Sequence, residues 1–528
     1  MLLNYRKIIG ILIVSIFLFS TNAVALTCSY DEVIEKSNIV QKDSNIKNID
    51  LIKSDEEDFD PLVDVEITVD IQKIRAFDKI DKYSDPDFYV MVIINDEEFI
   101  SEIFYDKVVV EDAFQVTYNV PDDKEYVNIT IQLWDWDILF DKKCDIGKND
   151  NSNAFRRDID IYYSIKTGHW FGDDEITLPH AWSVDYSGYG RANGCDDDSI
   201  YSQDLDCELF FDITQNDFDG DNIPYWTEVY YFNTDPEVDD TGSDDDNDDV
   251  PIEWEWKWGY SQRYNHSQHI SEDFWVYDPN IADDHHNLDP DCDSIDNYEE
   301  YLVSEWGSDP YRKDVYVELD TMDAGPNGEP KSELPENAKE LIYKAFNRQN
   351  VVFHLDDGDM GGSEIIPFDN VGEKSNSTEI NQFYNDYFLH GDLNNWRRGV
   401  FHYGMVLYST VSAAGFAFRP NAFQISTTGH EKLSAKPNFD RDLVYASAYM
   451  HELGHSLGLT WLGGHDRSSM APWQIGWWFW RPYKSIMNYG YMYGILHDLV
   501  DYSDGSRGFN DFDDWSNIDY SYFEEGDF

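Results

Sequence analysis

The stretch that decides the fold of the C-terminal part is Met450-His451-Glu452-Leu453-Gly454-His455-Ser456-Leu457-Gly458-Leu459, followed later by Ser485-Ile486-Met487-Asn488-Tyr489. Residues four apart project from the same face of a helix, so His451 and His455 can reach one tetrahedral metal ion. Glu452 is placed to act on a metal-bound water as a general base. The stretch therefore predicts a helix that carries a zinc site and ends at Gly458.

The two segments resemble the metzincin clan of metallopeptidases, whose H-E-x-x-H-x-x-G-x-x-H motif is followed at a distance by a Met-turn. The resemblance implies that His451 and His455 bind a catalytic Zn²⁺ ion and that Glu452 is the general base. It also implies that Met487 forms an apolar floor under the metal, and that Tyr489 donates a hydrogen bond to the tetrahedral intermediate. A packing role is the alternative for Tyr489.

The third metal ligand departs from the motif, because Trp461 stands where the clan has its third histidine. The segment Gly463-Gly464-His465-Asp466 offers two substitutes, and its glycines allow a longer turn back to the metal. We favour His465 as the third ligand. Asp466 competes with it, because carboxylate oxygen also suits zinc. A loop histidine that binds no metal is the remaining alternative.

Residues 311–528 are predicted to form this α+β, metzincin-like domain. Strand-like runs and helical stretches alternate in it, with strands expected at 315–319, 351–355 and 400–408 and helices at 335–350 and 442–457. The order of sheet, edge strand, active-site helix and Met-turn is what the resemblance implies.

An acidic pattern recurs three times between residues 214 and 310. Acidic side chains occupy positions 1, 3, 5 and 12 of each copy, and position 7 supplies a backbone carbonyl. The residues are Asp217, Asp219, Asp221, Ile223 and Glu228 in the first loop; Asp244, Asp246, Asp248, Val250 and Glu255 in the middle loop; and Asp289, Asp291, Asp293, Ile295 and Glu300 in the third loop.

This spacing resembles the calcium loop of EF-hands, and an Asp-Pro after each copy makes the segment more similar to thrombospondin type 3 repeats. The resemblance implies structural Ca²⁺ in each loop. The usual glycine at position 6 is replaced by Asn222, Asp249 and Ser294, of which Asn and Asp tolerate the required left-handed turn well. A disordered acidic linker is the alternative interpretation.

Residues 61–174 alternate apolar and polar side chains in short runs, which predicts an antiparallel, all-β sandwich. Two of its turns resemble the calcium loops of C2 domains, and the resemblance implies five ligands: Asp78, Asp85, Asp135, Asp137 and Asp145. A sandwich with solvated acidic turns is the alternative. Membrane association is not favoured even with calcium bound, because little basic sequence accompanies these loops.

Residues 175–213 are predicted to be an irregular connection held by a disulfide between Cys195 and Cys207, which are close in sequence. Cys144 and Cys292 lie in acidic segments, where we expect each thiol only to pack.

The formal charge of −67 arises from 105 acidic against 38 basic residues and argues against nucleic acid as a partner. Divalent cations are the expected partners. A salt-adapted protein would spread its acids over all surfaces, whereas these acids are clustered at fixed spacings.

The N-terminus predicts export. Residues 1–25 contain Arg6 and Lys7, an apolar run from Ile8 to Phe19, and Ala23-Val24-Ala25, which are the regions of a signal peptide. A polar segment, 26–60, follows. We therefore expect a secreted or cell-surface protein.

Together these features predict a multidomain, secreted, zinc-dependent endopeptidase that acts on a protein or peptide substrate and carries calcium-stabilised accessory modules. The alternative is a calcium-dependent extracellular adhesive or scaffold protein whose peptidase-like domain is inactive. The sequence leaves the substrate and the oligomeric state open.

Overall fold

The computed structural model describes residues 58–524, except 149–156, 175–189, 198–200, 202, 266–269, 372–375, 411–413, 460–470 and 495–498. The predicted signal peptide and most of the polar segment 26–60 lie outside the described residues. Within the described ranges, no helix is long and apolar enough to cross a membrane.

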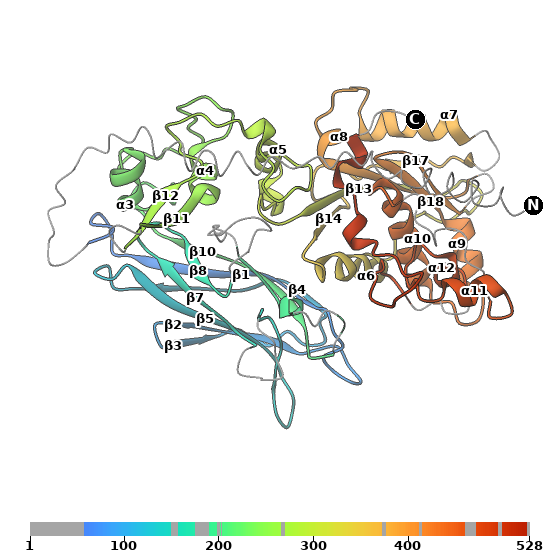
Figure 1. Ribbon diagram of the computed structural model, residues 1–528, viewed down its shortest axis with the longest axis horizontal. Coiled ribbons are helices and arrows are strands. Elements are labelled where there is room, and N and C mark those ends of the chain that lie inside the picture. The colour runs from blue at the N-terminus through green and yellow to red at the C-terminus, as the bar shows by residue number, and fades with distance from the viewer. Residues whose placement is uncertain are drawn as a thin grey trace, which may run out of the picture. The chain divides into compact units, whose positions relative to one another are not determined.

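The first domain is a sandwich of two antiparallel sheets, with strand orders β4-β1-β10-β9 and β3-β2-β5-β7-β8 (Figure 1). The strands are β1 (Glu66–Ala76), β2 (Phe88–Ile94), β3 (Glu97–Ile100), β4 (Val109–Asn119), β5 (Tyr126–Asp135), β7 (Ile159–Ser164), β8 (Trp170–Gly172), β9 (Gly190–Asn193) and β10 (Cys207–Gln215), with β6 (Lys142–Lys143) paired to β5. Alternate residues of both sheets, such as Val69 in β1 and Val92 in β2, are buried in one core. This confirms the predicted antiparallel sandwich.

The sandwich extends beyond the predicted boundary at residue 174. Strand β10 pairs with β1 over its whole length, and β9 pairs with β10, so part of the expected irregular connection 175–213 belongs to the sheet. The reason is visible in the sequence: Cys207, Leu209, Phe211 and Ile213 alternate as the buried face of a strand.

The predicted disulfide between Cys195 and Cys207 is wrong. Within the described chain both are free thiols, as is Cys144, whereas Cys292, expected only to pack, is disulfide-bonded. Cys207 points into the sandwich core beside Cys144 because it lies on the inward face of β10. Cys195 follows β9, and its Sγ lies 3.6 Å from Asp206 Oδ2.

The middle segment places its three loops among short helices and one hairpin. These are α3 (Tyr225–Thr227), η3 (Glu228–Phe232), α4 (Ile252–Gly259), β11 (Tyr260–Asn265), β12 (Ile270–Trp275), η4 (His285–Asn287) and α5 (Asn297–Leu302). The position-7 residues Ile223, Val250 and Ile295 are all buried. Each loop is thus anchored by the residue whose backbone carbonyl was predicted as a ligand.

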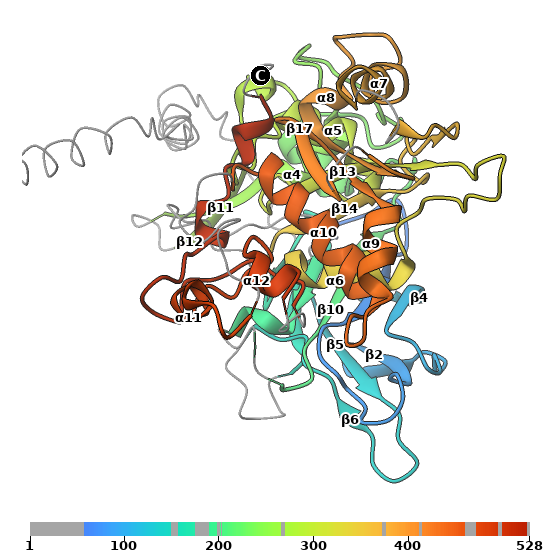
Figure 2. The ribbon, with the colours of Figure 1, turned by 90° about the vertical axis from the view of Figure 1, so that its right-hand side faces the viewer.

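The C-terminal domain is built on a mixed sheet of order β14-β13-β16-β18-β17, in which only β17 is antiparallel to its neighbour. Its elements are β13 (Asp314–Met322), α6 (Glu336–Asn347), β14 (Val352–Asp356), β15 (Ile365–Ile366), α7 (Asn376–Phe383), α8 (Arg397–Val400), β16 (Phe401–Leu407), β17 (Gly415–Arg419), β18 (Ala422–Ser426), α9 (Thr427–Ser434), α10 (Arg441–Ser456), α11 (Ile475–Trp480) and α12 (Tyr489–Met492). Helix α10 packs on β17, β18 and α6 (Figure 2). The expected strands and both helices are confirmed, whereas the metzincin-like identity of the domain stays a prediction.

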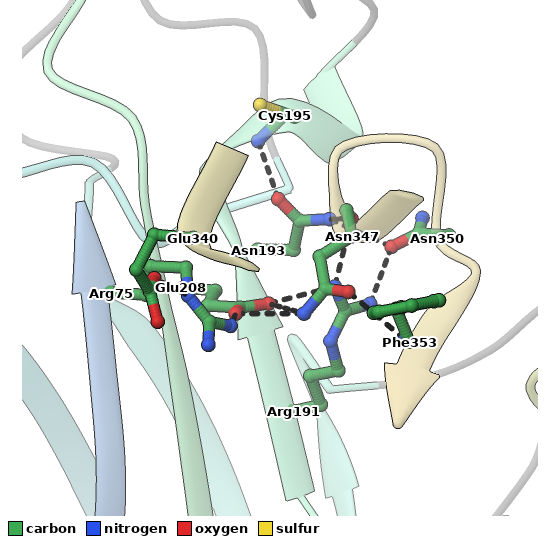
Figure 3. A network of polar contacts seen from close by, with 9 residues as sticks. All are labelled: Arg75, Arg191, Asn193, Cys195, Glu208, Glu340, Asn347, Asn350 and Phe353. Carbon is green, nitrogen blue, oxygen red and sulfur yellow. Dashed lines mark hydrogen bonds and ion pairs between the residues drawn. The ribbon is translucent and has the colours of Figure 1, made fainter. Parts of the chain in front are cut away.

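A buried ionic network joins the sandwich to the C-terminal domain (Figure 3). Glu208 on β10 is paired with Arg75 on β1 and with Arg191 on β9, the latter at 2.9 Å. Asn347 at the end of α6 donates to both carboxylate oxygens of Glu208, at 2.9 and 3.0 Å. Arg75 also reaches Glu340 on α6 at 3.0 Å. Burial alone would raise the pKa of Glu208, but Arg75 and Arg191 outweigh it and lower that pKa.

Replacing Glu208 with glutamine should destabilise the protein strongly, because two guanidinium groups would stay buried without their shared anion. We expect the free energy of unfolding in urea at pH 7 to fall by about 3–5 kcal/mol. The control is Glu333→Gln, whose partner Lys331 lies 3.3 Å away on the surface, where such pairs contribute about 1 kcal/mol or less.

The effect should also depend on pH. Because the pKa of Glu208 is lower in the folded protein than in the unfolded chain, where it is about 4.3, the ionised carboxylate contributes its full stabilisation above about pH 4.3. This stabilisation is lost as the pH falls through the pKa that Glu208 has in the folded protein. The difference between wild type and Glu208→Gln should therefore shrink in acid. If Glu208→Gln and Glu333→Gln lowered the free energy of unfolding by the same amount, the stabilising role of the buried ionic network would be contradicted.

Candidate functional site

Helix α10 has a defined start and end. The Asp440 side chain accepts hydrogen bonds from the backbone N–H groups of Asp442 and Leu443, which caps the first turn. At the other end Gly458 has φ +79°, Leu459 N–H donates to Gly454 O at 2.9 Å, and Gly458 N–H donates to His455 O at 3.3 Å. This pair of bonds is a Schellman motif, so the predicted glycine stop is confirmed.

The two histidines of α10 lie side by side. Their ring centroids are 5.0 Å apart, and His451 is buried while His455 is half-buried. His451 Nδ1 lies 2.9 Å from the carbonyl oxygen of Ile486. A histidine that donates its Nδ1–H to a backbone carbonyl presents Nε2 as a metal ligand, which is the usual arrangement in metal sites.

The side chain of Glu452 on α10 faces β17, the strand at one edge of the sheet. A Cβ atom at Gly415, the first residue of β17, would come within 2.5 Å of Glu452 Oε1. The glycine therefore allows the buried carboxylate to sit directly against the strand.

The 485–489 segment packs beneath the same turn of α10. Met487 is fully buried, and a Cβ atom at Gly454 would lie 2.8 Å from its sulfur. The Tyr489 ring, at the start of α12, has its centroid 5.4 Å from that of His451. The structure therefore gathers His451, His455, Met487 and Tyr489, as the sequence predicted, with Glu452 next to them on the helix. His465 and Asp466 lie outside the described residues, so the choice of third ligand stays open.

The three loops of the middle segment share one backbone conformation. Asn222, Asp249 and Ser294 at position 6 have φ of 69°, 77° and 73°, so all three adopt the left-handed turn. In each loop the position-1 carboxylate accepts the position-6 N–H, at 2.6, 3.2 and 3.0 Å. This repetition agrees with three copies of one ion-binding loop.

Each loop also has a further acidic residue that sequence reasoning missed. The backbone N–H groups of Asp240, Asp283 and Asp314 donate to the position-5 carboxylates of the first, middle and third loops, at 3.4, 2.9 and 2.6 Å. Asp240 adds its carboxylate to those of Asp221 and Glu228. These residues follow their loops at different distances along the chain, so no fixed spacing marked them.

Several carboxylate oxygens in the loops are buried without a hydrogen-bond partner among the described residues. They belong to Asp219, Asp246, Glu255, Asp291 and Glu300. Burial, with like charges next to it, raises the pKa of Asp221 to about 7, of Glu228 to about 8 and of Glu255 to about 10. Because buried anions without partners are costly, this donor set fits hard divalent cations such as Ca²⁺.

The five aspartates predicted as calcium ligands in the sandwich do not gather in one group. Asp135 and Asp137 lie with Asp81, and the ammonium of Lys142 reaches all three carboxylates, at 2.9, 2.8 and 2.5 Å. A cationic side chain therefore already occupies the centre of this group, and Asp81 was not among the predicted ligands.

The other three predicted ligands lie elsewhere in the sandwich. Asp78 accepts the backbone N–H groups of Asp204, Leu205 and Asp206, at 3.0 to 3.2 Å. Asp145 is buried 3.3 Å from Arg157 Nε, and Asp85 is exposed. Asp78, Asp135 and Asp145 thus make separate contacts, to backbone amides, Lys142 and Arg157 respectively, and calcium binding by the five residues stays a prediction.

No protein-family model matches the chain, and no curated protein matches it either. Among solved structures, human GIVD cytosolic phospholipase A2 with methyl gamma-linolenyl fluorophosphonate is 14% identical, with a TM-score of 0.18 over 30% of this chain and 18% of that chain. A structure of a C2 domain is 10% identical, with a TM-score of 0.18 over 29% of this chain and 98% of that chain. A C2 domain of plant Extended Synaptotagmin 1 is 11% identical, with a TM-score of 0.17 over 28% of this chain and 92% of that chain. The chain spans less than a fifth of the phospholipase. At these TM-scores the likenesses establish neither a shared fold nor a function.

Stripping divalent cations should make stability depend on pH. In the cation-free protein the raised pKa values of Asp221 and Glu228 mean that the folded state holds protons which the unfolded state releases. That stabilisation is complete below the unfolded pKa values, about 4, and is lost as the pH rises through 7 to 8. We expect the Tm in EGTA to fall between pH 6 and 9, and saturating Ca²⁺ to remove the fall.

Glu228→Gln should flatten the fall in EGTA, because glutamine does not ionise. Glu237→Gln, an exposed position of the same segment, is the control and should behave as wild type. A Tm in EGTA that stays constant or rises between pH 6 and 9 would show that these carboxylates do not gather as described.

Proposed function

We propose that the C-terminal domain is a zinc-dependent endopeptidase, in which His451 and His455 hold Zn²⁺ with His465 or Asp466 as the third ligand. The observation that carries the proposal is the contact of His451 Nδ1 with Ile486 O at 2.9 Å. It joins the two motif segments and orients the imidazole as metal-binding histidines are oriented. Bound Zn²⁺ would supply Lewis acidity that polarises a carbonyl group and activates water.

The chain's own residues account for the proton transfers. Glu452, one residue after His451 on the helix, would take a proton from the attacking water and return it to the leaving amine. The Tyr489 ring lies beside that of His451, and its hydroxyl would serve as a hydrogen-bond donor to the developing oxyanion.

The position of Glu452 against β17 suggests where the substrate lies. Strand β17 is the last strand of its sheet, and extended peptides bind proteins by adding a strand at such an edge. A peptide aligned along β17 would pass the carboxylate that abuts Gly415. We therefore propose that the substrate, a protein or peptide in extended conformation, binds along this strand.

The upstream modules fit an exported enzyme stabilised by ions. The buried carboxylates of the three loops favour bound divalent cations, with structural Ca²⁺ in the loops that have oxygen ligands alone, and these ions would hold the middle segment in a fixed conformation. The C2-like character of the sandwich is part of this proposal, and membrane binding is not. One observation favours the alternative of an inactive, adhesive protein: Trp461 replaces the third histidine of the clan.

The function is tested by Glu452→Gln. We expect casein cleavage to fall by about 10²–10⁴-fold while the zinc content stays that of wild type, because the carboxylate transfers protons without binding the ion. His451→Asn should lose one equivalent of zinc together with activity. Glu336→Gln, an exposed glutamate of α6, is the control and should change neither.

Two outcomes would contradict the peptidase. One is undiminished cleavage by Glu452→Gln. The other is a wild-type chain that binds calcium, gains no zinc at His451 and cleaves nothing, which would favour the adhesive alternative.

The third ligand is tested by His465→Asn and Asp466→Asn. The variant that lacks the true third ligand should lose one equivalent of zinc, the same equivalent that is lost in His451→Asn. The other variant should retain it. Retention of zinc and activity by both variants would exclude both residues.

A further inference from the structure

The middle loop differs from the other two because an imidazole joins its carboxylates. His285, the first residue of η4, is fully buried, and its Nε2 lies 3.2 Å from Asp248 Oδ2 and 3.9 Å from Glu255 Oε1. One ligand atom from each of the three side chains lies within 4.8 Å of the other two. In the first loop the corresponding group consists of three carboxylates, those of Asp221, Glu228 and Asp240.

The chain holds His285 at this place by several contacts. Asp283 N–H donates to Asp248 Oδ2 at 2.9 Å, which fixes the backbone two residues before the histidine. The rings of Tyr277 and Trp254 pack around the imidazole, with centroids 5.1 and 5.6 Å away. The imidazole is therefore confined with Nε2 facing the loop.

A second observation points to a ligand here. Glu255 is 1% exposed, and its Oε1 has no hydrogen-bond partner in the described structure. The same holds for both buried oxygens of Asp246 at position 3 of the same loop. The contact between His285 and Asp248 leaves Glu255 Oε1 buried without a hydrogen bond, whereas a cation bound by these three side chains would compensate that oxygen and lie near the carboxylate of Asp246.

Asn297 can set the required tautomer. Its amide lies 3.2 Å from His285 Nδ1, and its Oδ1 has no hydrogen-bond partner within the described ranges. A half-turn of this amide brings Oδ1 to Nδ1, where it accepts the Nδ1–H and leaves Nε2 as an electron-pair donor.

We propose that the middle loop binds a first-row transition-metal ion, represented by Zn²⁺, through His285, Asp248 and Glu255. Imidazole suits zinc and its neighbours in the series, whereas Ca²⁺ takes oxygen ligands alone. The first loop, with carboxylates only, remains a calcium loop. This assignment is independent of peptidase activity, because it involves no residue of α10.

The test uses the full chain carrying His451→Asn and His455→Asn, which removes the zinc proposed for α10. After equilibration with zinc in millimolar calcium, we expect one zinc per chain, and X-ray absorption at the zinc edge should show one imidazole nitrogen together with oxygen neighbours. In the wild-type chain the same ion should appear as an additional equivalent of zinc. Occupancy by calcium alone, or zinc surrounded only by oxygen, would overturn the proposal.

His285→Asn in that background should weaken zinc binding by about 100-fold or more. His286→Asn is the matched control, since this adjacent histidine is half exposed and its Nε2 contacts Asp249 at 3.2 Å. His285→Asp should exchange the zinc for one more calcium ion. Equal zinc in His285→Asn and His286→Asn would also overturn the proposal, and if the His285 variants fail to fold, the spectrum of the parent chain decides.

Discussion

The proposed active site depends on one contact, between the imidazole of His451 and the backbone carbonyl of Ile486. Helix α10 brings the histidines to one face, and this contact orients the ring of His451 through its Nδ1 atom. It also couples the helix to the segment that contains Met487 and Tyr489, which are far away in sequence. Tyr502 reinforces the coupling, since its hydroxyl donates to Met450 O at 2.6 Å.

Electrostatic repulsion is the second constraint on the chain. Its formal charge is −67, and many of the acids are buried in groups rather than spread over the surface. The protein neutralises them in different ways: Glu208 with two arginines, the group around Asp135 with Lys142, and the three loops through sites that fit divalent cations. Side-chain cations suffice where a lysine or arginine reaches the carboxylates. In the loops, several buried carboxylate oxygens have no hydrogen-bond partner among the described residues, and this is the basis on which we propose bound ions there.

Much of the fold was readable from the sequence, because it depends on local patterns. The helix ending at Gly458, the left-handed residues at position 6 and the central strands of both domains follow from periodicity and turn chemistry over a few residues. Strand β10 also had a readable alternation, but nearby cysteines and glycines suggested an irregular connection instead.

The site contacts that the sequence did not predict are those between segments far apart along the chain. Asp283 and His285 reach the middle loop from about 30 residues beyond its last ligand, and no spacing rule connects them. Lys142 enters the acidic group of the sandwich through the pairing of β6 with β5, which only the folded chain reveals. Conversely, Asp78 and Asp145 lie in turns that resemble the calcium loops of C2 domains, but backbone amides and Arg157 contact their oxygens.

The central claim is that α10 holds a zinc ion, and anomalous diffraction at the zinc edge from crystals of the zinc-loaded protein tests it most directly. We predict a peak about 2.0–2.1 Å from Nε2 of both His451 and His455, with the third ligand visible in the same map. Zinc-loaded crystals with no peak between these two nitrogens would contradict the account.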